Sequence, residues 1–236
     1  MGTDVMVRLA GVTKRFGNVW ALRGVDLELQ RGRCLSIFGP NGAGKTTLLK
    51  ILSTLTRPSA GTVTIAGHDA VREAEKVRPL LGVLGHRTFL YGHLTGQENL
   101  RFYARMFGMT GYAERAMEVL HAVGLEEHGR QLVRTYSRGM QQRLAIARTL
   151  LHRPPLLLLD EPYTGLDQQA VVRLQELLQQ LHAAAHTIIL STHDLRLGLM
   201  LSDDIAIQYR GKMVYHGVAT DLDALALEHL YFDYVK

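Results

Sequence analysis

The stretch Gly39-Pro40-Asn41-Gly42-Ala43-Gly44-Lys45-Thr46-Thr47 decides how this chain folds. It matches the phosphate-binding pattern G-x-x-x-x-G-K-[ST] at every specified position. The apolar segment 34–38 before it predicts a buried strand, and the leucine-rich segment 45–53 after it predicts a helix. Glycines let the backbone N–H groups of such a loop face a phosphate, and the helix start adds a partial positive charge. The stretch therefore predicts a nucleotide site rather than a glycine-rich turn that matches by chance.

Two side chains of this loop have expected roles in binding the nucleotide. Lys45 would reach the β- and γ-phosphates, and Thr46 would offer its hydroxyl to Mg²⁺. ATP and Mg²⁺ are therefore the expected cofactors. The loop residues predicted to bind ATP are Gly39, Pro40, Asn41, Gly42, Ala43, Gly44, Lys45, Thr46 and Thr47.

Strand patterns lie on both sides of the loop. Residues 5–29 alternate apolar and polar side chains in two runs, which is typical of half-buried antiparallel strands. Residues 62–66 and 81–84 predict further strands, and 205–209 with 212–215 predict a closing hairpin. The continuous apolar runs 156–160 and 187–191 are typical of parallel strands that are buried on both faces. The predicted fold class is α/β, with a mixed sheet core and an antiparallel β subdomain.

A helical pattern without strand signals extends over about residues 92–152. We expect this segment to be an α-helical subdomain inserted in the catalytic core of a single domain, residues 1–236. Residues 171–181 predict another helix, and the tail 222–235 predicts an amphipathic one.

The composition is that of an ordinary globular chain, with 236 residues, 47% apolar and 21% charged. A net charge of +5 permits an anionic partner without choosing one. The single cysteine, Cys34, rules out an internal disulfide, and its place in a predicted strand suggests a small buried hydrophobe. No apolar run approaches the roughly 18–20 residues that cross a bilayer, and the N-terminal residues lack the basic, apolar and small-residue layout of a signal peptide. We therefore expect a cytosolic location.

Polar residues follow the two apolar runs at the edge where the phosphate loop is expected. Asp160 is placed to hold Mg²⁺, and Glu161 to act as general base on the attacking water. The plain alternative is that both carboxylates cap the turn at Pro162. His193 follows the next strand, near the expected γ-phosphate, although an isolated histidine is more often structural. Ser137 predicts the N-cap of an apolar helix, and a Ser–Gly helix start without a local phosphate is a spare anion site.

Together these features resemble the ATP-binding subunits of ABC transporters over nearly the whole chain. The matching positions are Phe16, the phosphate loop, Tyr136-Ser137-Arg138-Gly139-Met140-Gln141-Gln142, Leu156 to Glu161, Gly165-Leu166-Asp167 and His193. An unrelated phosphate-loop kinase would need neither the Ser–Gly helix start nor the Asp–Glu pair. The resemblance implies an ABC-type P-loop NTPase that converts ATP and water to ADP and phosphate, coupled to transport.

The resemblance also implies a head-to-tail dimer that encloses two ATP molecules. Ser137 and Gly139 would bind the γ-phosphate held by the opposite subunit, and Asp167 would lie in the loop that communicates across that interface. His193 would contact the γ-phosphate and the attacking water. Phe16 would stack on adenine, although an aromatic before a glycine is more often a core residue. The catalytic set would be Lys45, Glu161 and His193.

Two places depart from the family pattern. Arg138 and Met140 stand where the commonest form has glycine and glutamine, while the phosphate contacts Ser137 and Gly139 are kept. His86 stands where the family has a glutamine that touches Mg²⁺ or the attacking water, and we assign it to the metal site. A neutral histidine could accept a hydrogen bond from water, whereas its protonated form would repel the metal. We hypothesise that ATPase activity depends on the protonation of His86.

The partners implied by the resemblance are a second ATP-binding subunit, which would form a homodimer, and separate membrane permease subunits that dock near residues 87–91. The chain would then work peripherally at the cytoplasmic face of the cell membrane, without nucleic acid. The segments 83–86, 94–103, 136–143 and 160–167 resemble the haem-exporter ATPase of bacterial cytochrome c maturation. The alternatives are an ABC-2-type drug, lipid or polysaccharide exporter and a soluble ABC ATPase in iron–sulfur assembly.

Overall fold

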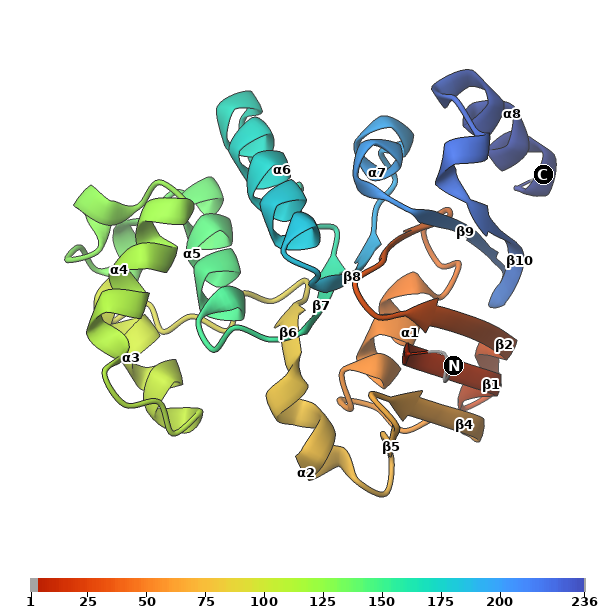
Figure 1. Ribbon diagram of the computed structural model, residues 1–236, viewed down its shortest axis with the longest axis horizontal. Helices are drawn as coiled ribbons and strands as arrows, with labels where there is room; N and C mark the ends of the chain where they lie inside the picture. The colour runs from red at the N-terminus through yellow and green to blue at the C-terminus, as the bar shows by residue number, and fades with distance from the viewer. Residues whose placement is uncertain (1–3, 236) are drawn as a thin grey trace.

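A computed structural model describes residues 4–235, which form two sheets and eight α-helices (Figure 1). The antiparallel sheet has the order β2-β1-β4-β5, with β1 (Val5–Phe16), β2 (Val19–Gln30), β4 (Ala60–Ile65) and β5 (His68–Asp69). The second sheet has the order β10-β9-β3-β8-β7-β6, with β3 (Cys34–Phe38), β6 (Leu81–Leu84), β7 (Leu156–Asp160), β8 (Thr187–Ser191), β9 (Asp204–Tyr209) and β10 (Lys212–Val218). It is parallel from β9 to β6, and β10 closes it as an antiparallel hairpin with β9. The predicted fold class is confirmed.

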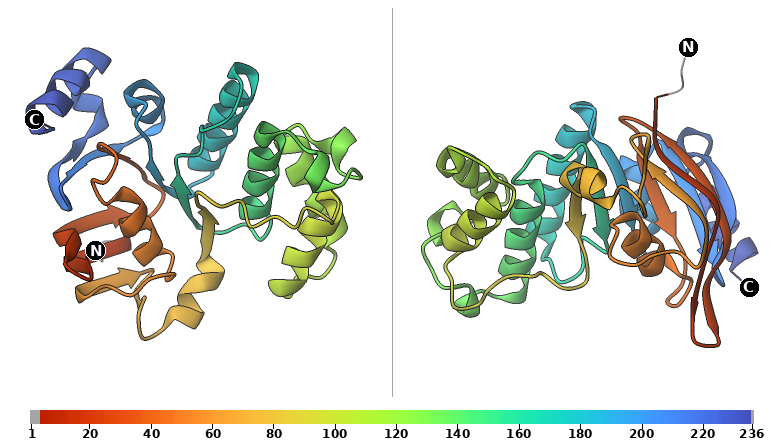
Figure 2. Two further views of the ribbon diagram at one scale, coloured as in Figure 1. Left: turned by 180° about the vertical axis from the view of Figure 1, so that it is seen from behind. Right: turned by 90° about the horizontal axis from the view of Figure 1, so that it is seen from below.

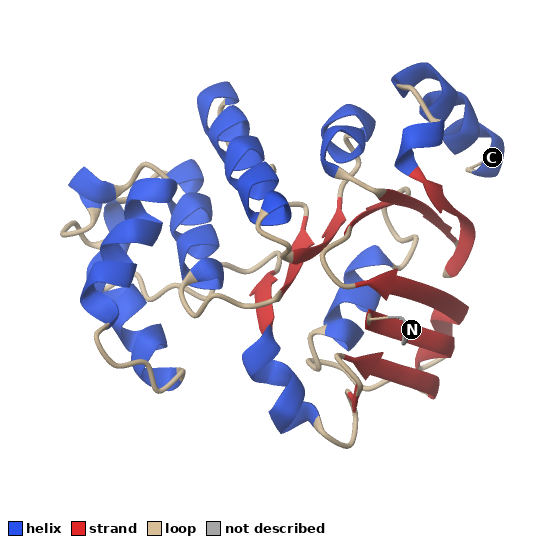
Figure 3. Cartoon of the chain, in the orientation of Figure 1, coloured by secondary structure: helices blue, strands red, loops and turns tan. Residues whose placement is uncertain are grey.

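The helices cover the six-stranded sheet on both faces (Figure 3). They are α1 (Lys45–Leu52), α2 (Ala74–Val77), α3 (Gly96–Met106), α4 (Tyr112–Ala122), α5 (Arg138–Leu150), α6 (Gln168–Ala183), α7 (Leu195–Leu201) and α8 (Ala224–Tyr234). Between β6 and β7 the chain forms α3, α4 and α5, which stand together beside the sheet. In both views of Figure 2 the antiparallel sheet lies far from these three helices, beyond α1.

Successive residues of the buried strands point to different hydrophobic cores, as the pleat of a strand requires. In β3, Leu35 and Ile37 pack in the core that α1 shares with the antiparallel sheet. Cys34 packs in the core of α3–α6, and Phe38 packs against α7 and α8. Because β3 is buried on both faces, all five of its side chains are buried. This burial holds the phosphate loop rigidly at the carboxyl end of β3.

The carboxyl ends of β3, β6, β7 and β8 lie at one edge of the sheet, because these strands run parallel. In β7 and β8 the register pairs Asp160 with Ser191, so the last residues of the two strands are neighbours. The predicted polar residues that follow each strand therefore meet beside the phosphate loop, as is usual for ligand sites of open α/β sheets.

Four elements differ from the sequence-based expectations. The helix α7, the short α2 and the two-residue strand β5 were not predicted. The tail does form the helix α8, but its apolar side chains do not gather on one buried face. Leu225, Phe232 and Tyr234 are exposed, while Leu227 is buried. Among residues 4–235, no helix combines the length and the apolar character needed to cross a membrane.

Candidate nucleotide-binding and hydrolysis site

The phosphate loop connects β3 to α1 through backbone angles that require glycine. Gly39 has a φ of 153° and Gly44, the N-cap of α1, has a φ of 109°. A Cβ atom on Gly44 would lie 2.5 Å from the carbonyl oxygen of Ala21 in β2. A larger residue would therefore push the loop away from the sheet. The first N–H groups of α1 lack intrahelical acceptors and form a site for an anion.

Lys45 is buried at the start of α1, with 7% of its surface exposed. Its Nζ donates to the backbone oxygens of Gly39 and, at 3.3 Å, of Pro40. Burial lowers the pKa of Lys45, while the nearby Glu161 and Asp160 oppose that shift. The loop's own carbonyls thus satisfy an ammonium group that is poorly solvated, and a phosphate could replace them.

Thr46 and Asp160 bring two oxygen ligands together beside the loop. The Thr46 hydroxyl donates to Oδ1 of Asp160 over 3.2 Å, and the Ser191 hydroxyl donates to the same oxygen over 2.6 Å. Asp160 is 8% exposed, so Ser191 and Thr46 fix its carboxylate. Within the described part of the chain, no group of three or more His, Cys, Asp or Glu side chains forms a metal cage. A hydroxyl and one carboxylate fit Mg²⁺, which takes its remaining ligands from phosphate and water.

Glu161 and His193 form a hydrogen-bonded pair in front of this carboxylate. Glu161 has a φ of 50°, an uncommon value for a residue with a side chain, and its N–H donates to the Ser191 oxygen over 3.0 Å. Nδ1 of His193 lies 2.8 Å from Oε2 of Glu161. The side chains are 28% and 75% exposed for Glu161 and His193 respectively. The pair is accessible to water and to a phosphate.

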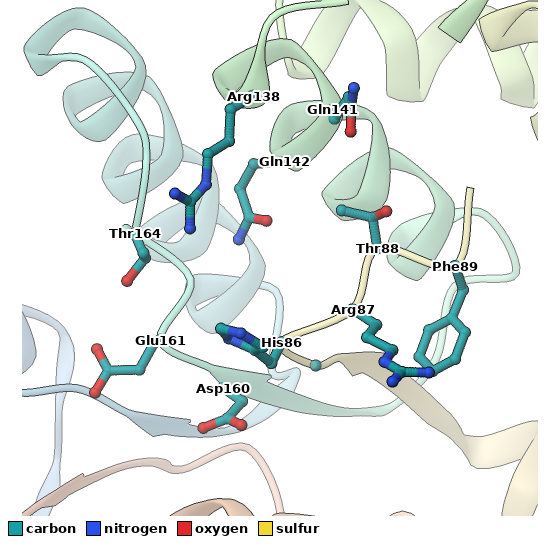
Figure 4. Close-up of a pocket in the computed structure, with 11 residues that line it drawn as sticks. His86, Arg87, Thr88, Phe89, Arg138, Gln141, Gln142, Asp160, Glu161 and Thr164 are labelled. Carbon is teal, nitrogen blue, oxygen red and sulfur yellow. The ribbon is translucent and has the colours of Figure 1, made fainter. Parts of the chain in front are cut away.

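His86 lies with Asp160 and Glu161 in a cleft of about 400 Å³ that separates the sheet edge from α5. In Figure 4 its imidazole is near Asp160, and the side chains of Arg138 and Gln142 extend toward the same cleft from α5. The structure therefore brings the predicted residue His86 to the carboxylates.

The structure does not bring Ser137, Gly139 or Asp167 to the phosphate loop of the same chain. Ser137 caps α5 by accepting from Met140 N over 3.2 Å, and Asp167 caps α6 by accepting from Ala170 N over 2.9 Å. A Cβ on Gly139 would lie 3.2 Å from the carbonyl oxygen of Gly165, so the start of α5 packs on the loop before α6. Across residues 4–235, no hydrogen bond or ion pair joins these three residues to the phosphate loop.

Phe16 ends β1 on the side of the antiparallel sheet that adjoins the phosphate loop, because Ala21 of the paired strand contacts Gly44. Its ring is 52% exposed, and the Nζ of Lys14 lies 4.9 Å from its centroid. The core alternative is therefore excluded, and the ring is free to stack on a ligand.

The sequence-based prediction missed Ser191, which donates to Asp160, and Gln208, which lies against the phosphate loop. Ser191 ends an apolar run as a polar residue, a signal that was present but was not used. Gln208 follows Ile205, Ala206 and Ile207 in β9 and is fully buried. A polar residue in such a run indicates a polar contact at that depth.

Known proteins are similar to this chain over nearly its whole length. Residues 22–164 match the family described as ABC transporter. The chain is 40% identical to a daunorubicin resistance ATP-binding protein of Streptomyces coeruleorubidus, covering 94% of this chain and 71% of that protein. It is 35% identical to the ABC transporter ATP-binding protein NatA of Bacillus subtilis, covering 96% and 92%. A linearmycin resistance ATP-binding protein of the same species is 35% identical, covering 92% and 70%.

Solved structures agree with these relatives. An ATP-binding cassette solved as a dimer in a post-hydrolysis state, with ADP and phosphate bound, superimposes with a TM-score of 0.84 at 30% identity. The match covers 91% of this chain and 99% of that one. An ATP-binding subunit of an ABC transporter gives a TM-score of 0.90 at 28% identity, covering 98% and 100%.

Proposed function

We propose that this chain, which belongs to the ABC transporter family, is the ATPase of an ABC-2-type exporter. As an ATP-binding subunit of that family, it binds and hydrolyses ATP. The observation that carries the choice of exporter is the set of similar proteins, several of which are named for resistance to daunorubicin, doxorubicin or linearmycin. Among the ABC-2-type drug, lipid and polysaccharide exporters, they favour a drug exporter, and they favour it over the haem exporter of cytochrome c maturation.

The phosphates of ATP bind at Gly39–Thr47 in this proposal. Lys45 leaves the Gly39 and Pro40 carbonyls for the β- and γ-phosphates, while the N–H groups at the start of α1 receive the remaining oxygens. Thr46 and Asp160 would hold Mg²⁺, and His86 lines the same cleft as Asp160. Bound Mg²⁺ would neutralise phosphate charge. Phe16 supplies a ring for adenine.

Glu161 is the general base that accepts the proton of the attacking water. Glu161 directly follows β7, and its N–H donates to the Ser191 oxygen. Its carboxylate is held by the hydrogen bond to His193. His193 fixes the carboxylate before ATP arrives and contacts the γ-phosphate afterwards. General-base catalysis by a positioned carboxylate contributes about 10²–10⁴-fold to the rate.

The site is completed by a second copy of the chain. Ser137 and Gly139 begin α5 with N–H groups that no phosphate of their own chain reaches, and Asp167 begins α6 beside them. In a two-fold head-to-tail dimer, the same patch serves each partner's ATP. The dimeric cassette that this chain resembles supports that arrangement.

The membrane partner docks on the aromatic surface formed by Phe89, Tyr91 and Phe102. These rings are 52%, 39% and 37% exposed, and the centroids of Tyr91 and Phe102 are 4.9 Å apart. The backbone beneath them is held by the buried Asn99, whose amide exchanges bonds with Tyr91 N and O over 2.8 and 3.0 Å. Exposed apolar rings on a fixed backbone suit a protein partner, and the chain would thereby work at the cytoplasmic face of the membrane.

A pull-down of the tagged chain from membranes tests this proposal. We expect it to recover a permease with several membrane spans, and the Phe89→Ala and Tyr91→Ala variants to recover less of it. Phe232→Ala, which alters a ring that is 58% exposed on α8, is the matched control. Recovery of haem-handling membrane subunits would reinstate haem export, and recovery of iron–sulfur proteins without a permease would favour the soluble alternative.

A further inference from the structure

Gln208 is a buried amide without hydrogen bonds. It lies in β9 and none of its surface is exposed. Among residues 4–235, neither its Nε2 nor its Oε1 has a hydrogen-bond partner. Buried polar groups are almost always paired, and an unpaired one calls for an explanation such as a role in function.

The phosphate loop rests directly on Gln208. A Cβ atom on Gly39 would lie 2.1 Å from the backbone oxygen of Gln208, and one on Gly44 would lie 2.7 Å from its Nε2. The first and the last glycine of the loop therefore contact the same residue. The turn after β9 also contacts the phosphate loop, because Gly211 N donates to the Ala43 oxygen over 2.9 Å.

The loop that rests on Gln208 contains carbonyl oxygens whose present donor is Lys45. The Lys45 ammonium donates to the oxygens of Gly39 and Pro40. A phosphate that draws Lys45 away leaves both carbonyls without that donor. Gln208 is the neighbouring side chain that has donors to spare, since both N–H groups of its Nε2 are unused.

We propose that Gln208 is a positioning residue for the phosphate loop, whose amide bonds to the loop backbone once nucleotide phosphate binds Lys45. An unpaired buried amide costs free energy, so the bond that Gln208 gains would favour the nucleotide-bound loop. The inference rests on the proposed assignment of Gly39–Thr47 as the nucleotide site.

Gln208→Met tests this role, because methionine has nearly the same length and no hydrogen-bonding group of comparable strength. The dissociation constant for ATP is measured by titration in EDTA, where hydrolysis stops, together with the unfolding midpoint without nucleotide. We expect ATP to bind about tenfold more weakly, which corresponds to the loss of one hydrogen bond of about 1.4 kcal/mol, and the midpoint to stay the same or rise. Gln175→Met is the control, since Gln175 is 9% exposed on α6 and its Nε2 donates to Met200 Sδ over 3.4 Å.

Gln208→Leu gives the second variant if methionine packs poorly, and the folded fraction of each variant is measured first, because unfolded protein would raise the apparent dissociation constant. Unchanged ATP affinity in the folded protein, for either variant, would overturn the positioning role and leave Gln208 as a packing residue. Lys45→Ala separates this failure from failure of the site itself. If Lys45→Ala also binds ATP normally, the nucleotide site is assigned wrongly. If it loses ATP while Gln208→Met does not, only the role of Gln208 is refuted.

Discussion

Nδ1 of His193 donates to Oε2 of Glu161 over 2.8 Å, and this bond joins the ends of the neighbouring strands β7 and β8. Glu161 adopts a positive φ to reach it, at a conformational cost of about 1–3 kcal/mol. The hydrogen bond to His193 thereby fixes the orientation of the carboxylate. Both residues follow strands whose register is set by buried side chains, so the precision of the pair derives from the sheet.

Glu161→Gln should stop hydrolysis while ATP still binds. The amide keeps the size of the side chain but cannot accept the proton of the attacking water, so the phosphate-release rate should fall by about 10²–10⁴-fold. With ATP, the variant should accumulate as a stable dimer in size-exclusion chromatography. Full ATPase activity in this variant would refute the role of Glu161 as base.

His193→Ala should lower kcat by about 10²-fold, because an unrestrained carboxylate is misplaced for the attacking water. ATP affinity should change little by comparison. The control is His121→Ala, which removes an exposed histidine on α4. Its Nδ1 lies 3.4 Å from Glu126 Oε1. Equal loss of activity in both variants would contradict a specific role for His193.

Ser191→Ala should raise the Mg²⁺ concentration needed for half-maximal ATPase activity by about 10–100-fold, as is common when an outer partner of a ligand is removed. The hydroxyl orients Asp160 through a 2.6 Å bond, and it contacts no expected phosphate position. ATP binding measured without Mg²⁺ should stay near the wild-type value. A Mg²⁺ requirement that does not change would show that Thr46 alone fixes the carboxylate.

A mixture of Ser137→Ala and Glu161→Gln chains should regain activity that neither has alone. In the mixed dimer, one site combines an intact Glu161 with an intact Ser137 from the other chain. Random pairing of equal amounts should restore roughly a quarter of the wild-type rate, as half of the dimers carry one intact site of two. Ser137→Ala also loses the α5 cap, worth about 1 kcal/mol, so its unfolding midpoint is checked first. A mixture without recovery would argue against shared sites.

His86→Gln should retain more ATPase activity than the wild type in acidic buffer, because glutamine cannot gain a positive charge beside the expected metal site. Protonated His86 would repel Mg²⁺ across the cleft, and glutamine carries no such charge. The pH–rate profiles of the two proteins are compared at saturating Mg²⁺. Superimposable profiles would remove His86 from the metal site.

Local patterns were enough to predict the phosphate loop, the Asp160–Glu161 pair and most strands, because each rests on neighbours in the sequence. Contacts between segments that are distant in the sequence could not be predicted from those patterns. Ser191 and Asp160 become partners only through the register of two parallel strands. α7 was missed because glycine interrupts its apolar pattern, yet a Cβ on Gly198 would lie 2.5 Å from the Phe38 ring. That glycine is required by packing, which the sequence alone does not display.

The position of β3 in the sheet also determines when the nucleotide site can form during synthesis. Its two neighbours are β8 and β9, which begin at Thr187 and Asp204. A ribosome delivers the chain from the N-terminus, so the strand that carries the phosphate loop has no pairing partner until the chain has been made past Thr187. Truncated chains that contain the whole loop should therefore fail to hold ATP, and quality control can recognise them by their unpaired apolar strand.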